Sequence, residues 1–162
     1  MRRLDPFDTA LLAALQRNAR QTADALSAAV GLSPAACQKR VKRLRDDGVI
    51  EREVAVLDPR AVGRRITVIV EVSLERERIE FLDAFKRRML QAEEVMQCYY
   101  VTGESDFVMI LTVPDMSAYE AFTRRHFFAE ANVSRFRTQI VMDRVKVGLS
   151  VPLDAAASGS AP

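Results

Sequence analysis

The apolar positions near the N-terminus repeat every three to four residues, a spacing typical of short amphipathic helices. Phe7, Leu11 and Leu15 recur on one face, and Asp5-Pro6 places a capping side chain and a proline where that face begins. The pattern predicts a first helix that ends near Arg17-Asn18.

Two further helices are predicted on either side of a short glycine turn. One runs from Thr22, its expected N-cap, to Val30 and ends at Gly31, because glycine takes positive φ at little cost. The next begins at Ser33-Pro34, with serine as the N-cap and proline at the first helical position, and ends near Asp47. Two helices around a tight turn, the second capped by Ser-Pro, are typical of a helix-turn-helix.

The third predicted helix has an apolar stripe. Cys37, Val41 and Leu44 lie within about 60° of one another on a helical wheel, so we expect them to be buried. Arg40 and Arg45 flank this stripe.

The opposite side of the same helix carries small residues at its leading end and cations behind them. A solvated face is the alternative interpretation, but the capped turn favours insertion into the major groove of DNA. We expect Gln38 and Lys39 to reach base edges, and Lys42 and Arg43 to reach phosphates. The expected DNA-contacting residues are Ser33, Pro34, Ala35, Gln38, Lys39, Lys42 and Arg43.

Beyond Gly48 the helical spacing stops. Val49-Ile50 and the run 54–57 are expected to form two short strands, either as a small wing or as the strand that leads out of the helical module. Turn-forming residues follow at 59–65, where we place a linker.

The second half of the chain begins with its clearest strand, residues 66–74, in which apolar residues alternate with others. The order strand-helix-strand-strand-helix-strand that follows is the ferredoxin-like βαββαβ plan. The apolar surface of residues 66–74 and 107–113 exceeds what two helices cover, so we expect the sheets of two subunits to associate. The other predicted elements are a helix over 78–91 with Leu82, Phe85 and Met89 on one face, a strand over 95–102, a turn at 103–106, a strand over 107–113, a helix over 116–129 and a long strand over 133–147.

The predicted fold class is therefore α+β, with two domains and a tail. The domains are a helix-turn-helix domain at 1–58 and a ferredoxin-like domain at 66–150, joined by the linker at 59–65 and followed by a small, polar, disordered tail at 151–162.

Charge is divided unevenly between these parts. Residues 1–64 hold 12 lysines and arginines against 8 acidic residues, whereas residues 65–162 hold 12 against 14. Only the first part has the net positive charge that favours binding to a polyanion.

The sequence also bears on location. No apolar run approaches the roughly 20 residues that span a bilayer, and we see no signal peptide, so we expect a cytoplasmic protein. Cys37 and Cys98 lack metal-ligand spacing and are expected to be reduced and mostly buried.

The sequence contains little that suggests catalysis. His126 is the one histidine, and a structural or surface role is favoured for it. We find no phosphate loop, metal cluster or nucleophile elbow, and expect no cofactor and no metal. Glu104 and Asp106 share a turn, where they can do acid–base work, hold an ammonium group or simply be solvated. Tyr99-Tyr100 fit a core more readily than a ligand platform.

Several of these segments together resemble the Lrp/AsnC family of regulators (leucine-responsive regulatory protein and asparagine-response regulator). The resemblance implies a winged helix-turn-helix, a ferredoxin-like ligand-sensing domain, and homodimers that assemble into tetramers or octamers. It also implies effector sites where dimers meet, usually for an amino acid. The similar segments are Leu4-Asp5, 30–34 with Cys37, Arg40-Val41 and Leu44, 48–50, 101–103 with Asp106, 113–116 and Val141-Met142.

One family motif differs here. The effector turn of the family commonly reads Gly-Asp-aromatic-Asp, whereas this chain has Gly-Glu-Ser-Asp at 103–106. Backbone N–H groups near Gly103 are expected to bind a carboxylate, and the acidic side chains an ammonium group. The expected effector site comprises Tyr100, Thr102, Gly103, Glu104, Ser105 and Asp106, with Thr138 from the neighbouring subunit.

The sequence thus predicts a cytoplasmic, sequence-specific regulator of transcription that binds double-stranded DNA and responds to a small effector, an amino acid. Two alternatives stay open. One is an enzyme similar to the sirohaem decarboxylases, against which the single histidine and the cationic third helix argue. The other is a nucleoid-type DNA-binding protein without an effector, because wrapping of DNA uses the same parts.

Overall fold

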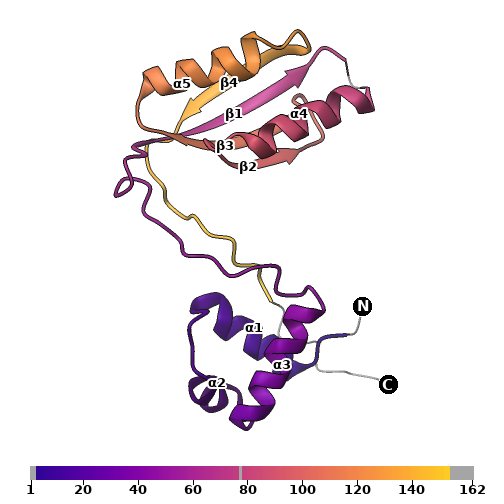
Figure 1. Ribbon diagram of the computed structural model, residues 1–162, viewed down its shortest axis with the longest axis vertical. Helices are drawn as coiled ribbons and strands as arrows, with labels where there is room; N and C mark the ends of the chain where they lie inside the picture. The colour runs from indigo at the N-terminus through magenta and orange to yellow at the C-terminus, as the bar shows by residue number, and fades with distance from the viewer. Residues whose placement is uncertain (1–2, 77, 154–162) are drawn as a thin grey trace. The chain divides into compact units, whose positions relative to one another are not determined.

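The computed structural model describes residues 3–76 and 78–153, which divide into two units (Figure 1). One unit comprises residues 3–55 together with residues 147–153, and the other comprises residues 56–146. None of the helices within the described ranges is both long and apolar enough to cross a bilayer.

Three capped helices make up the first unit: α1 (Pro6–Arg17), α2 (Ala23–Val30) and α3 (Pro34–Asp46). The three predicted N-caps are confirmed, because the side chains of Asp5, Thr22 and Ser33 each accept a backbone N–H from the first turn of their helix. Gly31 ends α2 with φ 73°, the left-handed conformation that glycine adopts without strain.

The core of this unit is small and aliphatic. Cys37 and Leu44 are fully buried and Val41 is 5% exposed, so the predicted stripe of α3 is confirmed. The stripe packs against α1 and α2 through Leu11, Ala14 and Leu26, with Leu15, Val30, Leu32 and Ile50 at the margin.

The prediction of two short strands after α3 is wrong. The N–H groups of Val49 and Ile50 both donate to the carbonyl of Leu44, at 2.9 and 3.1 Å, and so close the end of the helix. Residues 51–58 have no ladder partner within the described chain, and Val56 is 91% exposed. Apolar spacing alone does not make a strand, because a strand also needs a neighbour for its backbone groups.

The second unit confirms the predicted ferredoxin-like plan. Its strands are β1 (Ile66–Leu74), β2 (Val95–Tyr100), β3 (Phe107–Val113) and β4 (Val133–Ile140), in the sheet order β2-β3-β1-β4 with antiparallel pairing throughout. Its two main helices are α4 (Ile79–Gln91) and α5 (Met116–Thr123).

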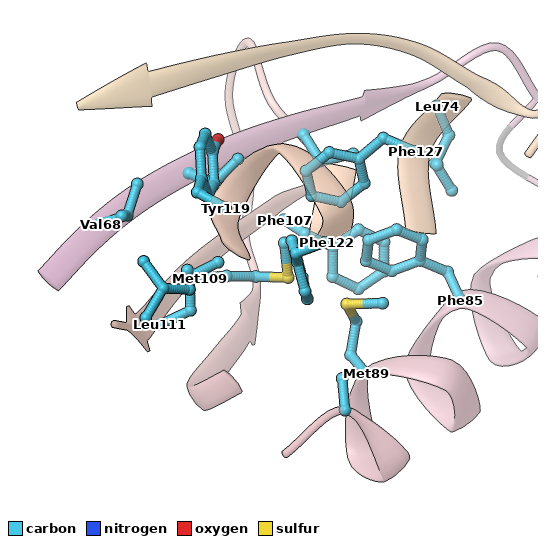
Figure 2. Close-up of a cluster of buried hydrophobic side chains, with 14 of the residues drawn as sticks. Val68, Leu74, Phe85, Met89, Phe107, Met109, Leu111, Tyr119, Phe122 and Phe127 are labelled. Atoms are coloured by element: carbon cyan, nitrogen blue, oxygen red, sulfur yellow. The ribbon is translucent and has the colours of Figure 1, made fainter. Parts of the chain in front are cut away.

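An aromatic core lies between the sheet and these two helices (Figure 2). Phe85 of α4 meets Phe107 of β3 with ring centroids 4.5 Å apart, and Phe122 of α5 meets Phe127 edge-on at 5.4 Å. All four phenylalanines are at most 2% exposed. The helix face predicted for residues 78–91 is confirmed, since Leu82, Phe85 and Met89 are the buried residues of α4.

The other face of the sheet carries a partly exposed apolar centre. The register pairs Ile69 of β1 with Ile110 of β3, and Glu71 with Val108. These side chains alternate with the buried row of β1, so they point away from α4 and α5.

The end of the second unit differs from the sequence-based expectation in two ways. The helix predicted over 116–129 changes at Arg124 to a short π-helix, η1 (Arg124–Phe128). The last strand ends at Ile140 rather than at 147, because the final ladder bond runs from the N–H of Val141 to the carbonyl of Thr67, the second residue of β1.

The chain after β4 returns to the helical unit. The N–H and the carbonyl of Val151 both bond to the side chain of Gln16 on α1, at 2.6 and 3.0 Å. Residues 151–153 of the predicted disordered tail are therefore placed against α1, while residues 154–162 lie outside the described residues.

Candidate DNA interface and ligand turn

The outward face of α3 carries the side chains that were predicted to meet DNA. Ala35, Gln38, Lys39 and Lys42 are exposed, and Ser33 and Pro34 start the helix at its exposed tip. The Lys42 ammonium lies 2.6 Å from the Asp46 carboxylate one turn further on, with 78% of its side chain exposed. Such an exposed pair is weak, so Lys42 remains available to a phosphate.

A buried carboxylate binds the other side of the helix. Asp8 is 2% exposed, and its Oδ1 lies 2.8 Å from Nη1 of Arg40 and 2.6 Å from Nη2 of Arg43. Arg40 also bonds Asp5 at 2.6 Å. Hydrogen bonds from Arg40 and the Asp8 backbone hold the pKa of Asp5 below its usual value. Burial opposes ionisation of Asp8, but the bonds from Arg40, the Asp5 backbone and Arg43 outweigh it, so the pKa of Asp8 is lowered too.

Arg43 therefore does not project freely, as the helical wheel had suggested. Its guanidinium faces Asp8 across the α1–α3 contact, and only 29% of its side chain is exposed. Among the described residues, Lys39 has no ion-pair partner, and Lys42 has only the exposed Asp46. The two lysines are thus the cations of this face that no buried carboxylate neutralises.

The predicted ligand turn joins β2 to β3 and is fixed to the end of β1 by Asp106. The Asp106 carboxylate accepts the N–H of Leu74 at 2.7 Å, and its own N–H donates to the carbonyl of Val72 at 2.9 Å. The carbonyl of Asp106 accepts the N–H of Val101 at 2.9 Å, which closes the turn. One oxygen of the Asp106 carboxylate therefore holds the turn to the end of β1.

The tip of the turn is open. Gly103 has φ 123°, which disfavours any residue with a Cβ, and a Cβ at this position would meet nothing within 4 Å. The side chains of Thr102 and Glu104 are exposed, and Ser105 is half-buried. A ligand can therefore approach the backbone here closely.

Two residues that sequence reasoning missed complete the turn. Ser73 of β1 donates its hydroxyl to the Glu104 carbonyl at 3.2 Å, and Arg135 of β4 donates to the same carbonyl at 3.3 Å. Ser73 and Arg135 face each other in the β1–β4 register. Only the pairing register of β1 and β4 could have identified these two residues, and that register is a property of the sheet rather than of either segment alone.

The remaining two predicted ligand residues lie apart from the tip of the turn. The Tyr100 ring packs 5.3 Å from Phe107 and has the Lys86 ammonium 5.2 Å from its centroid, with 54% of the residue exposed. Thr138 pairs with Val70 in the middle of β1, and its hydroxyl lies 2.5 Å from that of Tyr119. Within one chain, Thr138 is therefore not brought to the turn.

His126 and the cysteines lie elsewhere. The His126 ring packs 4.7 Å from Phe122, and its Nε2 accepts a hydrogen bond from Arg125 at 3.0 Å. Burial first, and the charge of Arg125 next, lower the pKa of this histidine. Both cysteines are free, but the expectation that both are mostly buried is wrong for Cys98, which is exposed on the edge strand β2.

Comparison with known protein families gives two matches that together cover most of the chain. Residues 67–151 match the Lrp/AsnC ligand binding domain, and residues 4–51 match a winged helix-turn-helix DNA-binding domain. The first match contains the whole predicted ligand turn, and the second contains α1, α2 and α3.

Individual relatives agree with these matches. An HTH-type transcriptional regulator of Sinorhizobium fredii is 52% identical over 151 residues, 93% of this chain and 89% of the relative. The leucine-responsive regulatory protein of Escherichia coli is 35% identical over 143 residues, 88% of this chain and 87% of the relative.

Solved structures show the same architecture. A transcriptional regulator of Neisseria meningitidis, crystallised as a complex with L-Met, has a TM-score of 0.88 at 30% identity, covering 94% of this chain and 98% of its own. An AsnC family regulator of Agrobacterium tumefaciens has a TM-score of 0.88 at 32% identity, covering 94% and 99%. With both domains matched and both kinds of relative in agreement, the chain belongs to the Lrp/AsnC family of DNA-binding transcriptional regulators.

Proposed function

We propose that this regulator contacts DNA through Gln38, Lys39 and Lys42 of α3, and that an amino acid bound at residues 102–106 controls its assembly and its DNA binding. The observation that carries the first part is the division of cations on α3. Arg40 and Arg43 are held by buried Asp8, whereas the two lysines stand exposed on the opposite side. In this proposal residues 1–58 bind DNA, residues 66–150 sense the effector, and residues 59–65 join them.

The proposed interface is tested by DNA binding as a function of salt. In this proposal Lys39, for which a base edge was the first expectation, meets a phosphate as Lys42 does, because both are exposed cations. Each such contact releases about one counterion, so Lys39→Ala and Lys42→Ala are each expected to flatten the log–log salt slope by about one unit on any sequence. Gln38→Ala is expected to change sequence preference instead. Arg87→Ala, an exposed cation on α4, is the matched control. Unchanged binding by the double lysine variant at every salt concentration would contradict the proposal.

The effector assignment rests on the open tip of the turn and on the exposed Glu104 carboxylate. The regulator of Neisseria meningitidis that was crystallised with L-Met supports an amino acid as the ligand class. Gly103 allows the ligand carboxylate to reach backbone N–H groups, and Glu104 offers a charge for its ammonium.

Glu104 provides the cleaner test of this site, because Asp106 already bonds the backbone of Leu74. Calorimetry with a panel of L-amino acids is expected to show binding to the wild type and at least tenfold weaker binding to Glu104→Gln. The free energy of unfolding should be the same for both proteins. Full affinity in the variant would place the site elsewhere.

Assembly is proposed to use the sheet face that α4 and α5 leave open. Ile69, Val108 and Ile110 form its apolar centre, and the Glu71–Arg137 pair at 3.7 Å lies beside it. A second copy of the same face would bury this centre and give a symmetric dimer, from which tetramers or octamers follow. Two helix-turn-helix units would then read half-sites spaced by about 10 base pairs or a multiple of it.

Light scattering tests this assembly. The wild type is expected to form dimers or larger species at micromolar concentration, and Ile110→Glu to shift them towards monomers. Gln91→Glu, at an exposed position at the end of α4 and away from this face, is the control and should leave the assembly unchanged. A wild type that stays monomeric would contradict the proposal.

The proposal includes no catalysis and a cytoplasmic location, where the DNA target lies. The single histidine packs on Phe122 and bonds Arg125, which is the environment of a structural side chain.

A further inference from the structure

Arg135 of β4 bonds the turn at 102–106, and its charge has no carboxylate partner among the described residues. The Nε of Arg135 donates to the Ser73 hydroxyl at 3.4 Å, and its Nη2 donates to the Glu104 carbonyl at 3.3 Å. Both acceptors are neutral. Among the described residues, no Asp or Glu side chain lies within ion-pair distance of this guanidinium.

Two other arginines of the sheet unit have acidic partners. Arg137, two residues along on the same face of β4, pairs with Glu71 at 3.7 Å, and Arg124 on η1 pairs with Glu120 at 2.6 Å. Arg135 is thus oriented by two neutral groups of the turn while its charge is left uncompensated. A guanidinium fixed in this way suits a carboxylate, which accepts two parallel N–H bonds from it.

The tip of the turn is polar. The side chains of Thr102, Glu104 and Ser105 and of the adjacent Ser73 are exposed or half-buried, and none of these four offers an aliphatic or aromatic wall. A branched apolar ligand side chain would gain little burial from them. An anionic one would find the guanidinium of Arg135 on β4 and the hydroxyl of Ser73 on β1 beside the turn.

We propose that Arg135, assisted by the Ser73 hydroxyl, binds the side-chain carboxylate of the effector and so selects an acidic amino acid. This inference rests on the proposed function, because it requires that the turn at 102–106 is the effector site. The backbone near Gly103 and the Glu104 carboxylate hold the α-carboxylate and the α-ammonium, groups that every amino acid shares. Arg135 then adds a contact that only an acidic side chain makes.

The experiment is calorimetry with L-glutamate, L-aspartate, L-glutamine and L-leucine on the full-length protein. Wild type is expected to bind at least one acidic amino acid at least tenfold more tightly than glutamine or leucine. Arg135→Gln is expected to remove that preference and to weaken the acidic ligand by about tenfold to a hundredfold, the range for a lost charged hydrogen bond. Its affinity for glutamine should stay unchanged. Arg135→Lys keeps the charge but loses the planar fork, so its affinity for the acidic ligand should lie between those of the wild type and Arg135→Gln.

Arg124→Gln removes an exposed, paired arginine far from the turn in sequence and is the matched control. Tighter binding of leucine than of glutamate by wild type would overturn the selection of an acidic ligand but leave the effector site intact. An equal loss for all four ligands in Arg135→Gln would overturn it as well, since Arg135 would then serve the shared groups. Unaltered binding of every ligand by Glu104→Gln would instead overturn the proposed effector site itself.

Discussion

The two units of this regulator hold their elements in place by different means. The helical unit has a small aliphatic core, a side-chain cap on each of its three helices, and a buried aspartate that binds two arginines of α3. The sheet unit has a core with four fully buried phenylalanines. A chain of about 50 residues buries too small a fraction of its surface to rely on apolar packing alone, so caps and ion pairs carry more of the stability in the first unit.

This difference decides which charges are available for function. Arg40 and Arg43 position α3 on α1 through ion pairs with Asp5 and Asp8, and these carboxylates neutralise their charge. In the sheet unit the aromatic core positions the strands, and Arg135 at the ligand turn is left without an acidic partner among the described residues. Counting cations on a helix or strand therefore overestimates those that meet a ligand, and the overestimate is larger where the core is small.

The largest expected effect lies in the aromatic core. Phe107→Ala removes a fully buried ring in contact with Phe85 and Tyr100, and is expected to cost about 4 kcal/mol of unfolding free energy. Hydrogen exchange should accelerate in the four strands and remain slow in α1, α2 and α3. Phe128→Ala, at a ring 71% exposed, is the control and should cost less than about 1 kcal/mol. Equal acceleration in both units would show that they do not have separate cores.

The next effect concerns the buried carboxylate. Asp8→Ala leaves Arg40 and Arg43 without their shared partner and removes half of the capping box, and is expected to cost about 2 kcal/mol, less than a fully buried pair because both arginines reach solvent. Chemical denaturation measures the loss. Asp46→Ala breaks only the exposed Lys42 pair and should cost a few tenths of a kcal/mol, roughly the value for exposed pairs. Similar losses in the two variants would mean that Asp8 has no special role.

Arg43→Gln separates positioning from DNA contact. Because its guanidinium faces Asp8, the variant is expected to lose about 1 kcal/mol of stability while the salt slope of DNA binding stays at the wild-type value. Lys39→Gln should do the reverse, flattening the slope at unchanged stability. A flattened slope for Arg43→Gln would show that this arginine leaves Asp8 to meet a phosphate.

The smallest effect is a difference in pH response between the units. The pKa of His126 is lowered in the folded state, so its neutral form is favoured, and its contribution to stability is present above pH 6.5 and lost as the pH falls through the folded pKa. The pKa values of Asp5 and Asp8 are lowered from 3.8, so their contribution persists until the pH falls below that value.

Hydrogen exchange across this pH range checks the order of the two losses. On acidification the sheet unit should begin to lose protection first, once the pH falls below 6.5, while the helical unit keeps its protection until the pH nears 3.8. His126→Gln should abolish the early loss. Earlier exposure of α1 and α3 than of the strands would contradict this order.

The elements themselves were predictable from local chemistry. Asp5, Thr22 and Ser33 were recognised as N-caps from their position before apolar spacing, and the period-two run at 66–74 identified β1. The turn at 103–106 was predicted as a ligand site through the resemblance and through Gly103; the positive φ of Gly103, which few other residues tolerate, came from the structure.

The predictions that were wrong concern pairing between distant segments. Residues 54–57 have the spacing of a strand but no partner in the described chain, and β4 ends where its ladder with β1 ends. Arg43 was placed outward because a helical wheel does not contain Asp8, which comes from α1.

The sequence by itself therefore determined the five α-helices, the four strands of the sheet, their order and the family, because caps, periodicity and motifs act over a few residues. Only the tertiary structure decided that Asp5 and Asp8 together neutralise Arg40 and Arg43, and that the β1–β4 register brings Ser73 and Arg135 to the turn at 102–106. The physical reason is that an ion pair or a hydrogen bond depends on a few ångströms of separation between side chains that are 30 or more residues apart, and that separation is set by packing rather than by local pattern.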